Sequence, residues 1–258
     1  MALRRVLLGF LSCWASLVLA DDDVELRACA ARALPERTMR QVQDVKVISA
    51  SGWTRESRRT VYWQRFDDGT IKVLFRVDRP KTEAGLKLLV IQKPAVDPVI
   101  YVYSPDLNRA RRVLGSGASN SVLGTDFTFE DAMHLQRFLS AAGTRRGSDT
   151  LLDGYPAYVA ETRPDEDNSA YTLIRTYIDK DSCLPMKSEF YGPSGELDKT
   201  LTLARDTLSK VGERWIPLRM VMESHRQRQR TELTASQVEI NVELPAGLFT
   251  VTEIEKSH

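Results

Sequence analysis

The chain has 258 residues, of which 42% are hydrophobic and 28% are charged, so it is long enough for one sizeable core. Its 36 Lys and Arg residues against 35 Asp and Glu residues give a formal net charge of +1. A nearly neutral chain with interspersed charges provides no electrostatic basis for binding nucleic acid.

The N-terminus predicts a secretory signal peptide. Arg4 and Arg5 precede an apolar run, and Ala20 then stands directly before three aspartates. The run is shorter than the roughly 20 apolar residues that span a bilayer, so an uncleaved anchor is the weaker alternative. We therefore expect residues 1–20 to be removed near Ala20 and residues 21–258 to form a single domain outside the cytoplasm.

Two cysteines remain after that leader, Cys29 and Cys183. In an oxidising compartment such a pair is a candidate disulfide, which would join an N-terminal helix to a distant turn. Two unlinked thiols are the alternative. The sequence has no Cys-x-x-Cys pair, which argues against a redox role.

Helical signals are confined to two segments. Residues 22–33 are rich in helix formers and begin with acidic side chains, which suit a helix N-terminus. A second helix is predicted over residues 128–142, where Thr128 and Asp131 approximate a capping box and Gly143 stands at the C-terminal end.

Nearly all other segments alternate with the period of two that is typical of strands. Residues 61–77 predict a hairpin whose turn is Asp68-Gly69. Further strands are predicted at residues 41–52, 86–92, 99–103, 109–114, 155–162, 171–179, 186–191, 197–208, 215–223 and 231–242. Strands with so little helix between them pair mainly antiparallel, and a sheet this large curls. We predict a mainly β fold, in which about 11 strands form a curved half-barrel whose concave face is covered by helices.

The alternation also nominates side chains for that concave face. Two predicted strands, within residues 61–77 and 215–223, each have an apolar stripe, and residues 99–103 are apolar on both faces. The candidate cavity lining is Val73, Phe75, Val77, Tyr101, Tyr103, Leu218, Met220 and Met222. Methionine suits a surface that must accept varied apolar ligands. The alternative is that these stripes pack a closed core.

The sequence offers little catalytic chemistry. His134 follows Glu130 by one helical turn with Asp126 and Asp131 nearby, but no third metal ligand is evident. We instead expect these three carboxylates to organise the start of the second helix. No phosphate loop, dinucleotide fingerprint or nucleophile elbow is present. We predict a protein without enzymatic activity, metal or cofactor.

Several segments, in an order that spans most of the chain, resemble the outer-membrane lipoprotein-sorting-like family, the LolA/LolB-like group. They are residues 80–89 (PKTEAGLKLL), 100–107 (IYVYSPDL), 111–113 (RRV), 123–131 (LGTDFTFED), 189–195 (EFYGPSG), 215–217 (WIP) and 248–250 (LFT). Within residues 123–131 we expect a structural motif of Gly124, Asp126, Phe127, Glu130 and Asp131.

The resemblance implies an antiparallel half-barrel in the periplasm, closed by helices around a lipid-accepting cavity. It implies a carrier or chaperone for the acyl chains of a lipid or lipoprotein, moving them between the inner and outer membranes. An inner-membrane lipid exporter of the resistance–nodulation–division type is the partner that it suggests. The alternative is a periplasmic regulatory or assembly module that senses lipid or binds a membrane protein. We expect a monomer.

Overall fold

The structure is a computed structural model that describes residues 21–33, 35–94, 96, 98–113, 120–137, 143–164 and 169–256. The predicted leader lies outside these residues. Within them, every helix is too short or too polar to cross a lipid bilayer.

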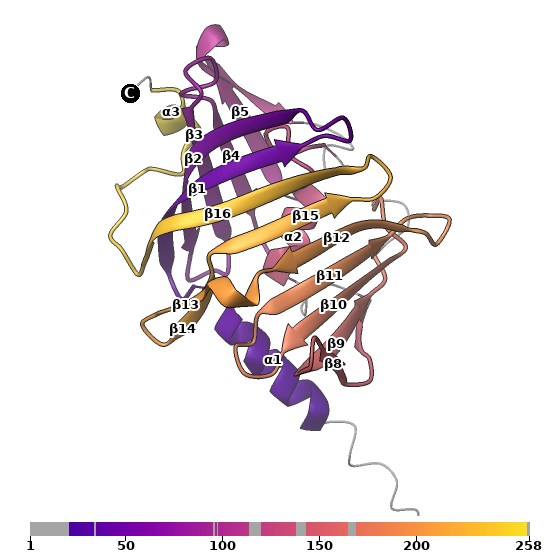
Figure 1. Cartoon of the computed structure of the whole chain (residues 1–258). Helices are drawn as coiled ribbons and strands as arrows, with labels where there is room; N and C mark the ends of the chain where they lie inside the picture. Colours follow the sequence, from indigo (N-terminus) through magenta and orange to yellow (C-terminus); the bar gives the residue numbers. More distant parts are fainter. Residues whose placement is uncertain are drawn as a thin grey trace, which may run out of the picture.

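One antiparallel sheet of 14 strands dominates the fold (Figure 1). Its first half runs from the edge in the order β6 (Arg109–Val113), β5 (Val99–Ser104), β4 (Lys87–Gln92), β3 (Ile71–Arg79), β2 (Thr54–Arg65) and β1 (Thr38–Ile48). Its second half continues with β16 (Gln229–Ile240), β15 (Arg219–Ser224), β12 (Leu197–Leu203), β11 (Pro185–Tyr191), β10 (Leu173–Asp179), β9 (Tyr155–Thr162) and β7 (Thr144–Arg146), and β8 (Thr150–Leu152) also pairs with β9. The sheet curls without closing, which gives an open half-barrel.

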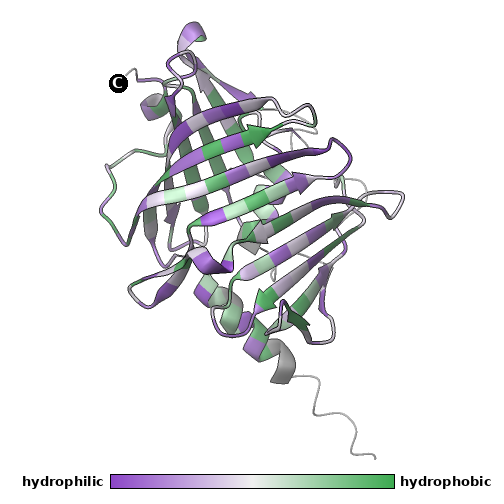
Figure 2. Ribbon diagram, in the orientation of Figure 1, coloured by the Kyte–Doolittle hydropathy of each residue, from purple (hydrophilic) through white to green (hydrophobic). Residues whose placement is uncertain are grey.

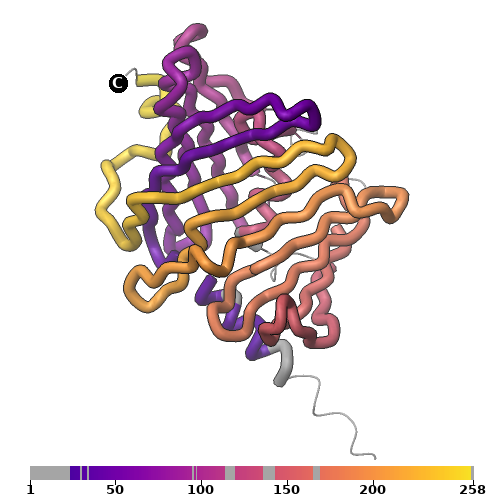
Figure 3. Tube along the Cα trace, in the orientation of Figure 1, coloured from indigo at the N-terminus to yellow at the C-terminus, as the bar shows by residue number. Residues whose placement is uncertain are grey.

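At the junction of the two halves, the first strand of the sequence pairs with the last. Strand β1 pairs antiparallel with β16, so that Val45 lies opposite Leu233, and Figure 3 shows the indigo and yellow segments side by side. A second, two-stranded sheet is formed by β13 (Leu208–Val211) and β14 (Arg214–Pro217). The helices are α1 (Asp21–Ala33), α2 (Phe129–Arg137) and α3 (Val251–Ile254), with 3-10 turns at Pro105–Leu107 and Arg205–Thr207.

The prediction of a curved antiparallel sheet covered by helices is confirmed. The predicted hairpin is β2 and β3, and its turn has Gly69 at a φ of 78°, a conformation that glycine adopts without steric cost. The segment 215–223 is two strands rather than one, because β14 ends at Pro217, which lacks an N–H, and pairs with β13. The second helix is described to Arg137, and residues 138–142 lie outside the described part.

Hydrophobic and hydrophilic residues alternate along many of the strands (Figure 2), and the buried side chains on the two faces of the sheet form separate clusters. The large cluster on the concave face includes Val45, Val61, Trp63, Val73, Leu88, Phe127, Phe190, Leu201, Met222 and Leu233. A cluster on the other face includes Leu74, Leu89 and Tyr103, which are covered by Phe249 and by Ile254 of α3. A third cluster packs Leu26 and Cys29 of α1 against β9 and β10. Burial of each such side chain stabilises the fold by about 1.5–3 kcal/mol.

Candidate functional site: an apolar cavity that contains one arginine

A cavity of about 250 Å3 lies between the concave face of the sheet and its helical cover. The sheet wall comes from β1, β2, β3, β12, β15 and β16, which supply Met39, Gln41, Gln43, Arg59, Val61, Trp63, Val73, Phe75, Leu203, Met220 and Leu233. The cover includes Ala33 and Pro35 near the end of α1, Ala132 and Leu135 of α2, and Val122 and Phe127 before α2. Most of these side chains are apolar, so the cavity suits an apolar ligand.

Three of the residues nominated from the sequence lie in this wall: Val73, Phe75 and Met220. Val77 and Met222 are buried in the core beside it, whereas Leu218 is half-buried between β14 and β15 and lies outside the lining.

The structure places Tyr101 and Tyr103 away from the cavity. The pairing of β5 with β4 and β6 puts Ile100 and Val102 with the concave core, so the two tyrosines belong to the cluster beneath Phe249. Tyr103 is only 1% exposed there.

Arg59 of β2 is the charged side chain of the wall. The residue is 5% exposed, its Nε donates to Gln43 Oε1 at 2.8 Å, and its guanidinium lies 5.0 Å from the centre of the Phe75 ring. Among the described residues no carboxylate forms an ion pair with it. Burial lowers the pKa of Arg59 to about 10, so it remains a cation at neutral pH.

Sequence reasoning missed Arg59 and Gln43. Both residues occupy inward positions, since Gln43 shares a face with Val45 and Arg59 shares a face with Val61. For Gln43, a polar residue in the apolar stripe of a predicted strand was the signal that could have found it, whereas Arg59 precedes the predicted hairpin of residues 61–77.

The expected structural motif fixes α2 to the sheet, and Asp131 is its centre. Asp131 is 0% exposed; its Oδ1 accepts from the Tyr171 hydroxyl at 2.7 Å, and its Oδ2 accepts from Lys199 Nζ and from the Thr128 N–H, both at 2.8 Å. The Thr128 hydroxyl accepts from the Asp131 N–H at 3.2 Å, which completes a reciprocal capping box. Burial, followed by the charge of Asp131, raises the pKa of Tyr171, so this hydroxyl remains a donor.

Asp126 ties the preceding loop to β16. Its Oδ2 accepts from the Thr231 hydroxyl at 2.7 Å, its Oδ1 accepts from Gln229 Nε2 at 3.0 Å, and Lys199 Nζ donates to its carbonyl at 2.9 Å. Burial raises the pKa of this carboxyl group. The neighbouring Phe127 faces the cavity, so this anchor also positions part of the cavity wall.

Gly124 and Glu130 complete the motif at its two ends. Gly124 has a φ of 71°, a conformation that other residues rarely adopt, and a Cβ there would displace the Arg55 guanidinium. The Glu130 carboxylate accepts from the Ser169 hydroxyl and from the Ala170 N–H, the latter at 3.1 Å. Burial raises the pKa of Glu130.

His134 of α2 contacts the sheet through a hydrogen bond. Its Nε2 lies 3.0 Å from the Thr176 hydroxyl, and its ring packs edge-on against Phe190. Burial lowers the pKa of His134 to about 4, so the ring is neutral at pH 7. The described residues include no cluster of three His, Cys, Asp or Glu side chains that could hold a metal ion.

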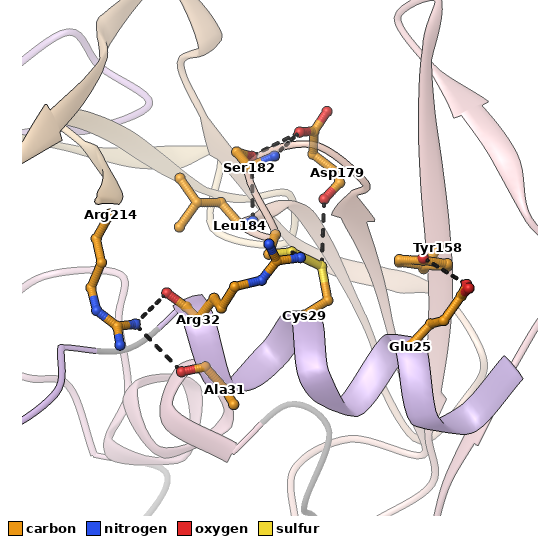
Figure 4. The surroundings of a disulfide bond; sticks show 10 residues. Glu25, Cys29, Ala31, Arg32, Tyr158, Asp179, Ser182, Leu184 and Arg214 are labelled. Carbon is orange, nitrogen blue, oxygen red and sulfur yellow. Dashed lines mark hydrogen bonds between the residues drawn. A yellow bond between two sulfur atoms is a disulfide. The ribbon is translucent and has the colours of Figure 1, made fainter. Parts of the chain in front are cut away.

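The predicted disulfide is present and fixes α1 to the turn that follows β10 (Figure 4). Cys29 and Cys183 are bonded with their Cα atoms 5.0 Å apart. Arg214 Nη1 donates to the carbonyl oxygens of Ala31 at 3.4 Å and Arg32 at 2.7 Å, which satisfies groups at the C-terminal end of the helix. Since Ala33 lines the cavity, the disulfide also holds this part of the cover in place.

An open, curved antiparallel sheet whose helical cover encloses an apolar cavity defines a LolA-like fold, and solved structures share it. A domain from Vibrio parahaemolyticus that is named for outer membrane lipoprotein sorting has a TM-score of 0.80 and 22% identity, with 91% of this chain and 98% of that chain covered. A DUF1329 family protein from Desulfovibrio piger has a TM-score of 0.82 and 21% identity, covering 90% and 98% of the two chains. A LolA superfamily protein from Nitrosomonas europaea has a TM-score of 0.65 and 17% identity, covering 88% and 96%.

The sequence itself matches a family model described as "Uncharacterized protein" over residues 69–256, so the chain belongs to that family. No protein with a curated description matches the sequence. The resemblance to the LolA-like group that the sequence motifs indicate is therefore confirmed at the level of the fold.

Proposed function

We propose that this protein is a periplasmic, non-enzymatic carrier that shields an acyl chain of a lipid or lipoprotein while it crosses between the inner and outer membranes. The observation that carries the proposal is the apolar cavity between the concave sheet and its helical cover. The LolA-like fold supports it, as does the N-terminal sequence typical of a signal peptide. An inner-membrane lipid exporter is the donor that fits this role, and we expect the carrier to act as a monomer.

The energetics explain why such a carrier needs an enclosed cavity. An engineered cavity of about 150 Å3 binds benzene, so by proportion a cavity of about 250 Å3 accepts about ten carbon atoms. Removing each CH2 group from water contributes about 0.8 kcal/mol, or about 8 kcal/mol for a chain of that length before the costs of binding. An acyl chain that crosses an aqueous compartment without cover would lose this stabilisation.

Bound lipid can be tested directly. Purified protein is extracted with organic solvent, the extract is analysed by mass spectrometry, and binding of a fluorescent fatty acid is measured. The carrier proposal predicts lipid at nearly one molecule per protein and saturable probe binding. Protein that contains no lipid and binds no probe would contradict it, and capture of a membrane protein by that lipid-free protein would favour the regulatory or assembly alternative.

A pair of variants in α2 links binding to the cavity. Ala132 lines the cavity, whereas the adjacent Met133 does not. Ala132→Trp should fill the space and abolish probe binding at an almost unchanged melting temperature, and Met133→Trp should bind as the wild type does. Equal binding by both variants would place the ligand elsewhere.

A further inference from the structure

The cavity contains a buried positive charge that the protein itself does not neutralise. Arg59 is 5% exposed, and its hydrogen bond to Gln43 uses only Nε. Among the described residues, Nη1 and Nη2 have no hydrogen-bond acceptor and no carboxylate partner. Burying a cation without a partner lowers the stability of the folded protein. A bound anion would offset that loss.

Gln43, the hydrogen-bond partner of Arg59, leaves a further donor beside the guanidinium. Gln43 must present Oε1 to the Arg59 Nε, because a guanidinium only donates, and this leaves the Gln43 amide NH2 as a further donor. The guanidinium carbon lies 5.0 Å from the centre of the Phe75 ring, a cation–π contact that uses none of its N–H groups. A planar guanidinium with free Nη groups matches the two oxygens of a carboxylate.

The rest of the cavity wall determines which chain a ligand with such a carboxylate can carry. Apart from Gln41 and Gln43, the other residues that line the cavity are apolar, including Val61, Val73 and Leu135. The volume of about 250 Å3 accommodates about ten carbon atoms by the same proportion as above. One unbranched chain fits this space, whereas the several acyl chains of a lipoprotein exceed it.

We propose that Arg59 and Gln43 form a carboxylate-binding site inside the cavity, and that the ligand is a single-chain fatty acid. This inference rests on the proposed carrier function and names its ligand class. The acid would be buried with its carboxylate on β1 and β2 and its chain along Val73 and Met220.

The test compares ligands that differ only in the head group. Binding of decanoate, decanol and decyltrimethylammonium to the mature chain is measured by calorimetry near neutral pH, where Arg59 is protonated. We expect decanoate to bind about tenfold to hundredfold more tightly than decanol, as charge-assisted hydrogen bonds require, and the cationic ligand to bind least. Equal affinity for decanoate and decanol would overturn the carboxylate site while leaving the carrier proposal intact, whereas absence of binding by all three would contradict both.

Two variants then assign the preference to Arg59. Arg59→Gln should lose the preference for decanoate over decanol but still bind decanol, and Arg59→Met offers a second replacement without charge. The matched control is Arg58→Gln, because Arg58 lies next along β2 on the opposite face and pairs with Asp44 at 2.7 Å. Retention of the decanoate preference by Arg59→Gln, or its loss in Arg58→Gln, would refute the assignment. The wild-type ligand comparison remains decisive even where a variant does not fold.

Discussion

Removal of the Cys29–Cys183 disulfide should destabilise the protein strongly, because the bond closes a loop with a sequence separation of 154 residues. In the loop-entropy treatment, a cross-link over a loop of that length restricts the unfolded chain by about 5 kcal/mol, and native disulfides contribute about 2–5 kcal/mol when measured. Both cysteines are buried in the cluster of Leu26 and Ile178, so alanine substitutions remove only the sulfur atoms from a packed site. We therefore expect Cys29→Ala/Cys183→Ala to lower the free energy of unfolding by about 3–5 kcal/mol.

Urea unfolding followed by tryptophan fluorescence measures this difference, since the chain has four tryptophans. Reductant should shift the wild-type midpoint towards that of the double variant and leave the variant unchanged. Fully reduced wild type, verified by alkylation, that unfolds at the same urea concentration as the oxidised protein would refute the entropic reasoning. Two freely alkylated thiols in native protein from an oxidising compartment would refute the cross-link itself.

Three further predictions concern α2 and the wall. Asp131→Ala should lower the free energy of unfolding by about 3–5 kcal/mol, because it leaves the half-buried Lys199 and the buried Tyr171 hydroxyl without the carboxylate that they share. A change below about 0.5 kcal/mol in urea unfolding would contradict this. The pKa of His134 is about 4 in the folded protein and 6.5 in the unfolded chain. As pH drops, the unfolded chain therefore binds the proton first. The free energy of unfolding should fall by about 3 kcal/mol between pH 6.5 and pH 4. The buried carboxylates at the start of α2 have raised pKa values, so their protonation stabilises the fold in acid, and they do so equally in wild type and in His134→Gln. His134→Gln should therefore lose less stability than the wild type as pH falls. Equal losses would contradict the role given to His134. Met220→Asp at the cavity wall should mainly abolish fatty-acid binding, whereas Met222→Asp, at a residue 0% exposed, should cost several kcal/mol in thermal unfolding; equal destabilisation by both would indicate a closed core.

The sequence was informative about the fold because period-two alternation and turn residues are local signals. The β2–β3 hairpin follows from Asp68-Gly69 and the apolar stripe that contains Val73 and Phe75. The disulfide could be predicted from the oxidising compartment that the leader indicates and from the number of cysteines, since only two remain after the leader. The capping box at Thr128 was equally local.

The remaining features depend on contacts between distant segments. Strand β5 is apolar on both faces, so its own residues could not indicate which side Tyr101 and Tyr103 would take. That choice depends on Phe249 and the C-terminal segment, which cover the other face of the sheet. Arg59 was missed because residues 54–60 are all polar. Polar and apolar residues therefore do not alternate there, and the sequence does not show that Arg58 points outward and Arg59 inward.

The openness of the sheet has a consequence for self-association. An open sheet ends in edge strands whose backbone groups can pair with another copy, and here the ends of the described sheet are β6 and β7. Strand β6 contains Arg109, Arg111 and Arg112, and β7 has three residues, two of them Arg145 and Arg146. Two edges of this kind repel each other electrostatically, and the shorter one provides few hydrogen bonds. The half-barrel can therefore remain open without offering its strands as a template for fibre growth.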